Sequence, residues 1–277
     1  MKNFGGILTY GIPEFRLPAE ILQKTINKIV KIPGINVKYN VSLGKDFTLE
    51  ELTKKYDGVF LAIGSNCSTK MNIDGENLTG VYGANELLEN KNFPEFKGKT
   101  VAVIGGGNVA MDVARTVKKL GANEVLVIYR RAQEQMPAEN REIEEAKKEN
   151  IKFLFQNNIT KILPNEDGKK VKKIQCIKTE LVKKEESERL VPVNIPESNY
   201  FIDVDYVVMA VGSHTQKNIL NECKLELDEK GYIKVDENYK TNIDKVFAGG
   251  DIIGSKQTVA WASRIGRDVA NKIIELI

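Results

Sequence analysis

The chain has 277 residues, enough for about two domains, and its 41 basic and 38 acidic residues leave a net charge of only +3. This balance gives no sign of a nucleic-acid partner. No stretch approaches the roughly 18 apolar residues of a membrane span, and residues 1–4 do not begin a signal peptide, so we expect a cytoplasmic protein without nucleic-acid or membrane partners.

Cysteine and histidine are too few and too scattered for most side-chain chemistry. Cys67, Cys176 and Cys223 lie far apart with no Cys-x-x-Cys, and His214 is the single histidine. A redox disulfide, a zinc site and a Ser-His-Asp triad therefore all lack parts within these residues. We expect no catalytic side chain and no metal ligand.

Residues 1–95 contain elements that do not complete a domain by themselves. A helix is expected after Pro18 and before Pro33, with apolar residues on one side. A strand is expected over residues 36–41, a short helix over 49–56 and a buried strand over 57–65. The last of these ends in Gly64-Ser65.

Residues 100–110 read Thr-Val-Ala-Val-Ile-Gly-Gly-Gly-Asn-Val-Ala, a buried strand followed by Gly-x-Gly-x-x-Ala and a helix that Gly121 ends. Gly105 permits the tight turn, Gly107 lets a pyrophosphate approach the main chain, and Ala110 lets the helix pack closely on the strand. The pattern predicts a dinucleotide-binding turn. The alternative is an ordinary glycine-rich connection between strand and helix.

The next strand, expected over residues 125–128, is followed by Tyr129-Arg130-Arg131. Enzymes that use NAD place an acidic residue here for the ribose 2′-hydroxyl, whereas guanidinium groups can bind a 2′-phosphate. The pair of arginines therefore favours NADP(H). The alternative is that both arginines only solvate a loop.

The rest of the chain contains a repeat of the pattern of residues 57–65 and, near its end, a Gly-Gly-Asp segment before a helix. A helix is expected over residues 138–149, a strand over 151–155 and an antiparallel meander over 169–203 with its turn at 183–189. Residues 205–213 repeat the pattern of 57–65, which suggests two related nucleotide-binding domains, one inserted in the other, unless the likeness of two buried strands is chance. A strand within residues 241–251 ends in Gly-Gly-Asp before a helix over 257–276, where Asp251 could bind a polyol.

Together these residues resemble the NADPH-dependent, flavin-containing small subunit of glutamate synthase. That family includes the electron-entry modules of dihydropyrimidine dehydrogenase, ferredoxin:NADP transhydrogenases and sulfide dehydrogenase. The matching stretches are residues 5–18, 105–115, 129–131, 135–138 and 247–267.

The resemblance implies an α/β fold with two Rossmann-like domains, which is the FAD/NAD(P) fold of disulfide reductases. It implies that an NADPH domain of residues 96–213 is inserted into an incomplete FAD domain, which consists of residues 1–95 and 214–277. It implies that NADP(H) is held by Gly105, Gly107, Asn108, Val109 and Ala110 at the pyrophosphate, by Arg130 and Arg131 at the 2′-phosphate, and by Gly212 at the nicotinamide. It also implies that FAD is lined by Ile12, Arg16, Gly64, Gly250, Asp251, Gln257, Thr258 and Val259.

The implied activity is hydride transfer from NADPH to FAD, after which electrons pass to iron–sulfur clusters. The first expected partner is the glutamate synthase large subunit, which makes glutamate from 2-oxoglutarate and glutamine. A subunit of a ferredoxin:NADP transhydrogenase or a sulfide dehydrogenase, with another iron–sulfur acceptor, is the alternative.

Family members carry a cysteine-rich iron–sulfur region and a first strand, Gly-x-Gly-x-x-Gly and helix before the equivalent of Gly5-Gly6, and this sequence contains neither. The chain thus resembles a member cut within its FAD domain. We therefore expect weak or absent FAD and self-association through the incomplete domain. A further alternative is a non-catalytic NADP-binding fragment.

Overall fold

The computed structural model describes residues 4–183, 190–215 and 217–275. They form two compact units, the first made of residues 1–6, 23–67 and 213–277 and the second of residues 7–22 and 68–212. These limits differ from the expected domains, because residues 7–22 and 68–95 pack with the expected NADPH domain. Two short strands, β2 (Cys67–Ser68) and β12 (Ser213–His214), lie where the chain passes from one unit to the other.

The second unit is built on a five-stranded parallel sheet. Its order is β3 (Val81–Gly83), β11 (Tyr206–Met209), β4 (Thr100–Ile104), β5 (Glu124–Tyr129) and β6 (Lys152–Phe155). Side chains alternate between the two faces of a strand, and the central strands are apolar at nearly every position, so both faces are buried.

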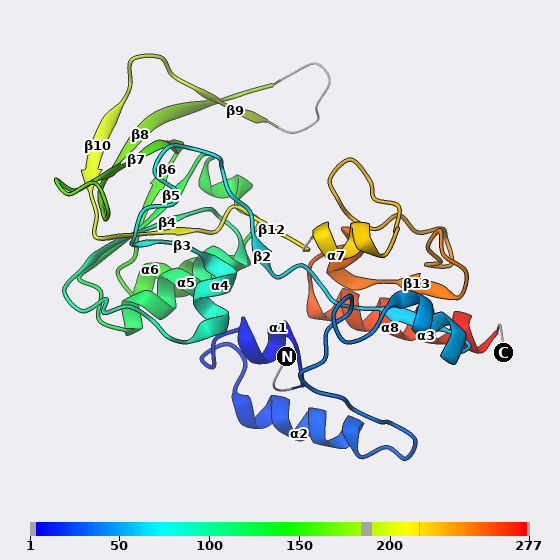
Figure 1. Cartoon of the computed structure of the whole chain (residues 1–277). Coiled ribbons are helices and arrows are strands. Elements are labelled where there is room, and N and C mark those ends of the chain that lie inside the picture. The colour runs from blue at the N-terminus through cyan, green and yellow to red at the C-terminus, as the bar shows by residue number, and fades with distance from the viewer. Residues whose placement is uncertain (1–3, 184–189, 216, 276–277) are drawn as a thin grey trace. The chain divides into compact units, whose positions relative to one another are not determined.

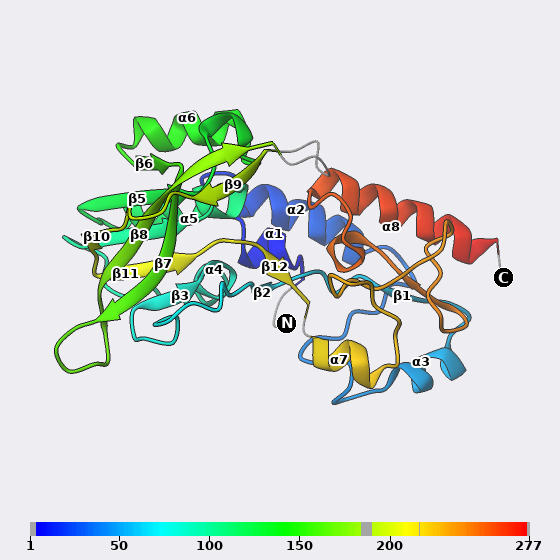
Figure 2. The same ribbon diagram turned by 90° about the horizontal axis from the view of Figure 1, so that it is seen from above.

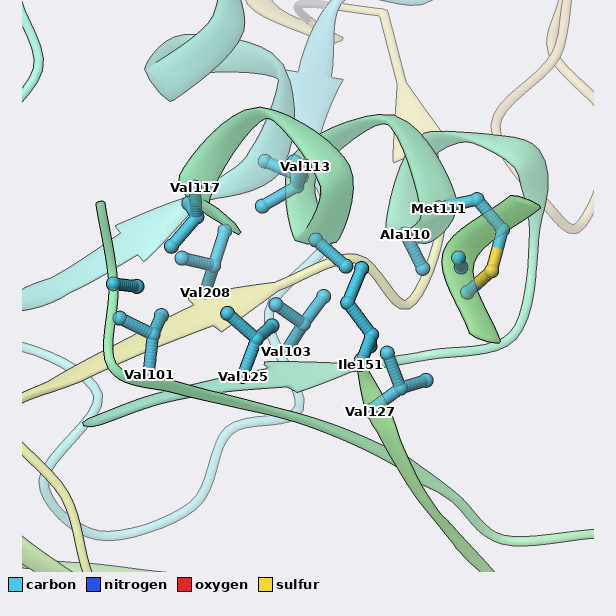
Figure 3. Packing of buried hydrophobic residues seen from close by; sticks show 14 of the residues in the cluster. Val101, Val103, Ala110, Met111, Val113, Val117, Val125, Val127, Ile151 and Val208 are labelled. Atoms are coloured by element: carbon cyan, nitrogen blue, oxygen red, sulfur yellow. The ribbon is translucent and has the colours of Figure 1, made fainter. Parts of the chain in front are cut away.

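One face of this sheet carries helices α4 (Ala84–Asn90), α5 (Asn108–Lys119) and α6 (Asn140–Lys148). Figure 3 shows valines of β4, β5 and β11 pointing toward the apolar side of α5. Val113 and Val117 recur one helical turn apart on that side, so α5 lies flat on the strands. This packing fixes the start of α5 directly behind the end of β4.

The opposite face carries an antiparallel sheet, as expected for residues 169–203 (Figure 1). Its strands are β7 (Asn157–Pro164), β8 (Val171–Val182), β9 (Val191–Asn194) and β10 (Tyr200–Asp203), with β8 pairing with all three others. Ile174 and Cys176 of β8 pack on Ala102 and Ile104 of β4. The expected turn falls mostly on residues 184–189, which lie outside the described residues.

The first unit is built on two parallel strands, β1 (Val59–Leu61) and β13 (Val246–Ala248). Figure 2 shows α8 (Val259–Ile274) on one side of β1, and α3 (Leu49–Lys55) and α7 (Lys217–Glu222) on the other. A short 3₁₀ helix, η2 (Gly250–Ile253), follows β13. The repeated sequence pattern thus forms β1 here and β11 in the second unit, each within a parallel sheet.

The remaining elements are α1 (Ile7–Tyr10), α2 (Ala19–Val30) and the 3₁₀ helix η1 (Gln133–Gln135). The expected strand over residues 36–41 is wrong, because this segment forms no strand and Asn40 has a φ of +56°. β3 and α4 were not expected. Of the helices that the structure describes, none is long and apolar enough to cross a membrane.

Candidate functional site

Three glycines connect β4 to α5, and their surroundings differ. Gly105 has a φ of +139°, and a Cβ there would lie 2.2 Å from the carbonyl oxygen of Ala210. A Cβ on Gly106 would lie 2.6 Å from the ring of Tyr129, whereas one on Gly107 would meet only Pro137, at 3.9 Å. Packing therefore requires glycine at the first two positions and leaves the space over Gly107 open.

The N-terminus of α5 opens onto that space. Gly107 is the N-cap of this 12-residue helix and provides no side-chain acceptor for its first amide groups. Ala110 is buried against the sheet, and Val109 is partly exposed. The first amides of a helix and its dipole together attract anions, so this turn has the features of a phosphate site.

Arg130 and Arg131 follow β5, the strand next to β4. Arg130 is exposed. Arg131 is half-buried, and its Nε is a buried donor that forms no hydrogen bond with any described residue. Neither guanidinium forms an ion pair within the described part of the chain. A buried donor without a partner is costly, and an anion would satisfy it.

The loop of residues 130–139 is fastened to the glycine turn. The amide of Ala138 donates to the carbonyl oxygen of Gly106 at 3.1 Å, and the amide of Glu139 donates to Oδ1 of Asn108 at 2.9 Å. The Tyr129 hydroxyl donates to the carbonyl oxygen of Gln135 at 2.6 Å, while the Gln135 Oε1 is buried without a partner among the described residues. The arginines are thus held beside the turn.

Gly212 lies at the same edge of the sheet. It follows β11, which pairs in parallel with β4, and it has a φ of +129°. Its carbonyl oxygen accepts a hydrogen bond of 2.9 Å from the amide of Thr69. The structure therefore brings the glycine turn, the two arginines and Gly212 to the carboxyl ends of three neighbouring strands, where open parallel sheets bind ligands.

Most residues expected to line FAD lie together in the first unit. Gly64 and Gly250 follow the paired strands β1 and β13, and the Ser65 hydroxyl donates to the carbonyl oxygen of Asp251 at 3.2 Å. Gly64 and Gly250 have φ values of +67° and +80°. A Cβ added to Gly64 would meet no atom within 4 Å, and one added to Gly250 would meet only the Cβ of Ala262, at 3.9 Å.

Helix α8 begins a few residues after Asp251 in the chain. Thr258 caps this helix by accepting a hydrogen bond of 3.3 Å from the amide of Trp261, and Gln257 and Val259 beside it are exposed. Burial raises the pKa of the Asp251 carboxyl above its ordinary value. This edge combines an open glycine turn, a half-buried carboxylate and a helix N-terminus.

Ile12 and Arg16, also expected at FAD, belong to the second unit. Nη1 of Arg16 lies 2.9 and 2.8 Å from the two carboxylate oxygens of Asp112 on α5. The structure therefore gives the Arg16 guanidinium a partner on the helix that follows the glycine turn.

Sequence reasoning missed two groups of residues. Pro137 borders the open turn, and Gln135 accepts the hydrogen bond of Tyr129, whose ring lies against Gly106. The only signal for either residue was the family resemblance of residues 135–138. The ion pairs of Asp112 and Arg115 were also missed, because both residues lie on the side of α5 opposite Val113 and Val117, where charged residues are ordinarily exposed to solvent.

Comparison with known proteins identifies the family and the fold of the chain. The family model described as pyridine nucleotide-disulphide oxidoreductase matches residues 1–266. The beta subunit of the NADP(+)-dependent formate dehydrogenase of Moorella thermoacetica is 37% identical over 97% of this chain and 38% of its own length. The NADPH glutamate synthase small chain of Escherichia coli K12 is 33% identical over 98% of this chain and 61% of its own.

Mycobacterium tuberculosis FprA, solved in complex with NADPH, shares the fold with a TM-score of 0.84 and 20% identity over 98% of this chain and 75% of its own. The predicted disulfide-reductase-like α/β fold and the resemblance to glutamate synthase small chains are thereby confirmed. The chain spans less than two thirds of the length of both relatives.

Proposed function

We propose, from the premise that this chain belongs to the pyridine nucleotide-disulphide oxidoreductase family, that the carboxyl edge of the β3-β11-β4-β5-β6 sheet binds NADP(H). The observation that carries this proposal is the unpartnered buried Nε of Arg131 beside a glycine turn that is open over Gly107. Both features lack a purely structural explanation. An anionic ligand that spans the turn and the arginine loop provides one.

Each part of the nucleotide then has a binding element. The first amides of α5, at Asn108, Val109 and Ala110, donate to the pyrophosphate over Gly107. Arg130 and Arg131 bind the 2′-phosphate through charge-assisted hydrogen bonds. The nicotinamide extends along the same edge toward Gly212, since β11 lies beside β4.

We propose FAD as the second cofactor, because the resemblance to the flavin-containing glutamate synthase small subunit implies it and the first unit offers a matching edge. We expect this chain to bind FAD weakly. Bound FAD would accept a hydride from NADPH and release its electrons singly. Asp251 would accept hydrogen bonds from the polyol hydroxyls of FAD, and the N-terminus of α8 near Gln257, Thr258 and Val259 would stabilise a negatively polarised oxygen of the cofactor. Gly64 and Gly250 leave their turns open to the ligand.

The electron acceptor is proposed to be an iron–sulfur protein. The preferred candidate is the large subunit of a glutamate synthase. The support is the resemblance to a glutamate synthase small chain. A formate dehydrogenase beta subunit is 37% identical, against 33% for that small chain. A different iron–sulfur acceptor, such as that of a ferredoxin:NADP transhydrogenase or a sulfide dehydrogenase, is therefore the alternative. Mixing the chain with the large subunit of its own organism should yield glutamate only when NADPH, 2-oxoglutarate and glutamine are all present.

A second candidate function, NADP binding without turnover, is favoured by one observation. The described residues contain one strand, Gly-x-Gly-x-x-Ala turn and helix of this kind, at β4 and α5. A visible absorption spectrum after incubation with FAD separates the two functions. Flavin bands that bleach when NADPH is added support the oxidoreductase, whereas a colourless protein that still binds NADP⁺ supports the binding protein.

A further inference from the structure

A group of buried charges joins the two helices that follow the candidate nucleotide site. Asp112 and Arg115 on α5 are 4% and 7% exposed, and Glu142 on α6 is 9% exposed. Buried charges are tolerated only when they are paired and hydrogen-bonded. Nη1 of Arg115 donates to Oε2 of Glu142 at 2.6 Å, which ties α5 directly to α6.

Arg16 contacts both helices from outside them in the chain. Its Nη1 bridges the two carboxylate oxygens of Asp112, and its Nε lies 3.4 Å from Oε1 of Glu142. Without Arg16, two buried carboxylates would face each other with one guanidinium between them. Like charges in a buried place repel, so Arg16 offsets a repulsion between the carboxylates of α5 and α6.

The neighbouring Phe15 strengthens this attachment. The guanidinium carbon of Arg115 lies 4.5 Å from the centre of the Phe15 ring, and Nζ of Lys119 lies 5.2 Å from it. Both cations also bind Oε1 of Glu149, at 3.0 and 2.8 Å. Two successive residues of the segment 7–22 thus engage charged groups of α5.

The place of these contacts relative to the candidate site gives them a functional meaning. α5 begins directly behind the glycine turn, and α6 begins directly behind the loop of residues 130–139. Hydrogen bonds from Ala138 and Glu139 already join loop and turn at their near ends. Arg16 adds a connection further along both helices, at Asp112 and Glu142.

We propose that Arg16 is a positioning residue for NADP(H), which holds α5 and α6 so that the glycine turn and the arginine loop bind the pyrophosphate and the 2′-phosphate of one nucleotide together. This inference rests on the proposed function of the sheet edge. A ligand that spans both places is sensitive to their separation, whereas a ligand that contacts only the arginine loop is not.

The test compares two ligands on the full chain. Arg16→Gln and the wild type are titrated with NADP⁺ and with adenosine 2′-monophosphate, at a temperature at which thermal unfolding shows both to be folded. We expect the Kd for NADP⁺ to rise about tenfold and the Kd for adenosine 2′-monophosphate to stay within about twofold. Arg267→Gln, which removes an exposed arginine from α8 of the other unit, is the matched control and should change neither.

Arg16→Lys separates positioning from stability. Lysine keeps a positive charge beside Asp112 but has no Nε–H to reach Glu142 in the same fork, so thermal stability should recover while NADP⁺ binding stays weakened. Full recovery of NADP⁺ binding by lysine, unchanged NADP⁺ binding by a folded Arg16→Gln, or equal losses of both ligands would each overturn the positioning role. A wild-type chain that binds neither ligand would instead contradict the proposed function itself.

Discussion

Gly105 and Gly107 in the glycine turn are required for different reasons. Gly105 is required by its left-handed φ and by the carbonyl of Ala210, and neither requirement involves a ligand. Gly107 has an ordinary φ of −91° and an open space in front of it. The sequence motif predicted both glycines, but only the structure distinguishes the packing role of the first from the open space at the third, where we propose that the ligand binds.

Alanine at Gly105 should therefore mainly lower stability, whereas alanine at Gly107 should mainly weaken NADP⁺ binding. Gly105→Ala should lower the free energy of unfolding by about 3 kcal/mol, because the new Cβ meets backbone at a strained φ. Gly107→Ala should cost no more than about 1 kcal/mol, the value of a changed N-cap, yet weaken NADP⁺ binding about tenfold or more. Denaturant unfolding and calorimetric titration of both variants check this. Normal NADP⁺ affinity in Gly107→Ala would contradict the open-turn interpretation.

Elements with strong local patterns were predictable, and those that depend on distant partners were not. The apolar runs of β4 and β5 and the helical period of α5 are sufficient to indicate a strand or a helix, and all three elements were predicted. β3 is only Val-Tyr-Gly, and it is a strand because β11, far along the chain, pairs with it. Residues 36–41 alternate like a strand but have no partner strand among the described residues, and Tyr39 and Val41 remain exposed.

At the contact of α5 with α6, Asp112 should make the stability of the chain depend on pH. Burial raises the pKa of Asp112 to about 6, with the nearby Glu142 also raising it and Arg16 and Arg115 lowering it. Between about pH 4 and 6 the folded chain then binds a proton at Asp112 that the unfolded chain does not, so the stability from this group falls as the pH rises.

The comparison with Asp112→Asn isolates this group. The free energy of unfolding of the wild type, minus that of the variant, should decrease by about 2 kcal/mol between pH 4 and 7. Urea unfolding at several pH values measures the difference. An increase over this range would mean that the bond to Arg16 outweighs burial and lowers the pKa of Asp112.

At the scale of the whole molecule, the division into units departs from the expected domains for a packing reason. Ala84, Leu87 and Leu88 of α4 share one core with Val101 and Val208 of the parallel sheet. Residues 68–95 therefore belong with the candidate NADP(H) site, although no motif in them indicates a nucleotide. The sequence could not show this, because an apolar helix side gives no sign of which sheet it covers.

Matched leucine variants test the division. Leu88→Ala removes core volume from the second unit, and Leu220→Ala does so in the first, and each should cost about 2 to 5 kcal/mol. In calorimetry, NADP⁺ should raise only the unfolding transition of the unit that binds it. Leu88→Ala should lower that transition and Leu220→Ala the other. The reverse assignment would place residues 68–95 with the first unit.

The most direct test of the account is the choice between NADP⁺ and NAD⁺ by the full chain and by its Arg130→Gln/Arg131→Gln variant. The wild type should prefer NADP⁺. The variant should lose on the order of 1.5 to 3 kcal/mol of NADP⁺ binding for each charged hydrogen bond removed, and should bind NAD⁺ as the wild type does. Equal losses for both nucleotides, or no preference in the wild type, would contradict the assignment of this edge to NADP(H).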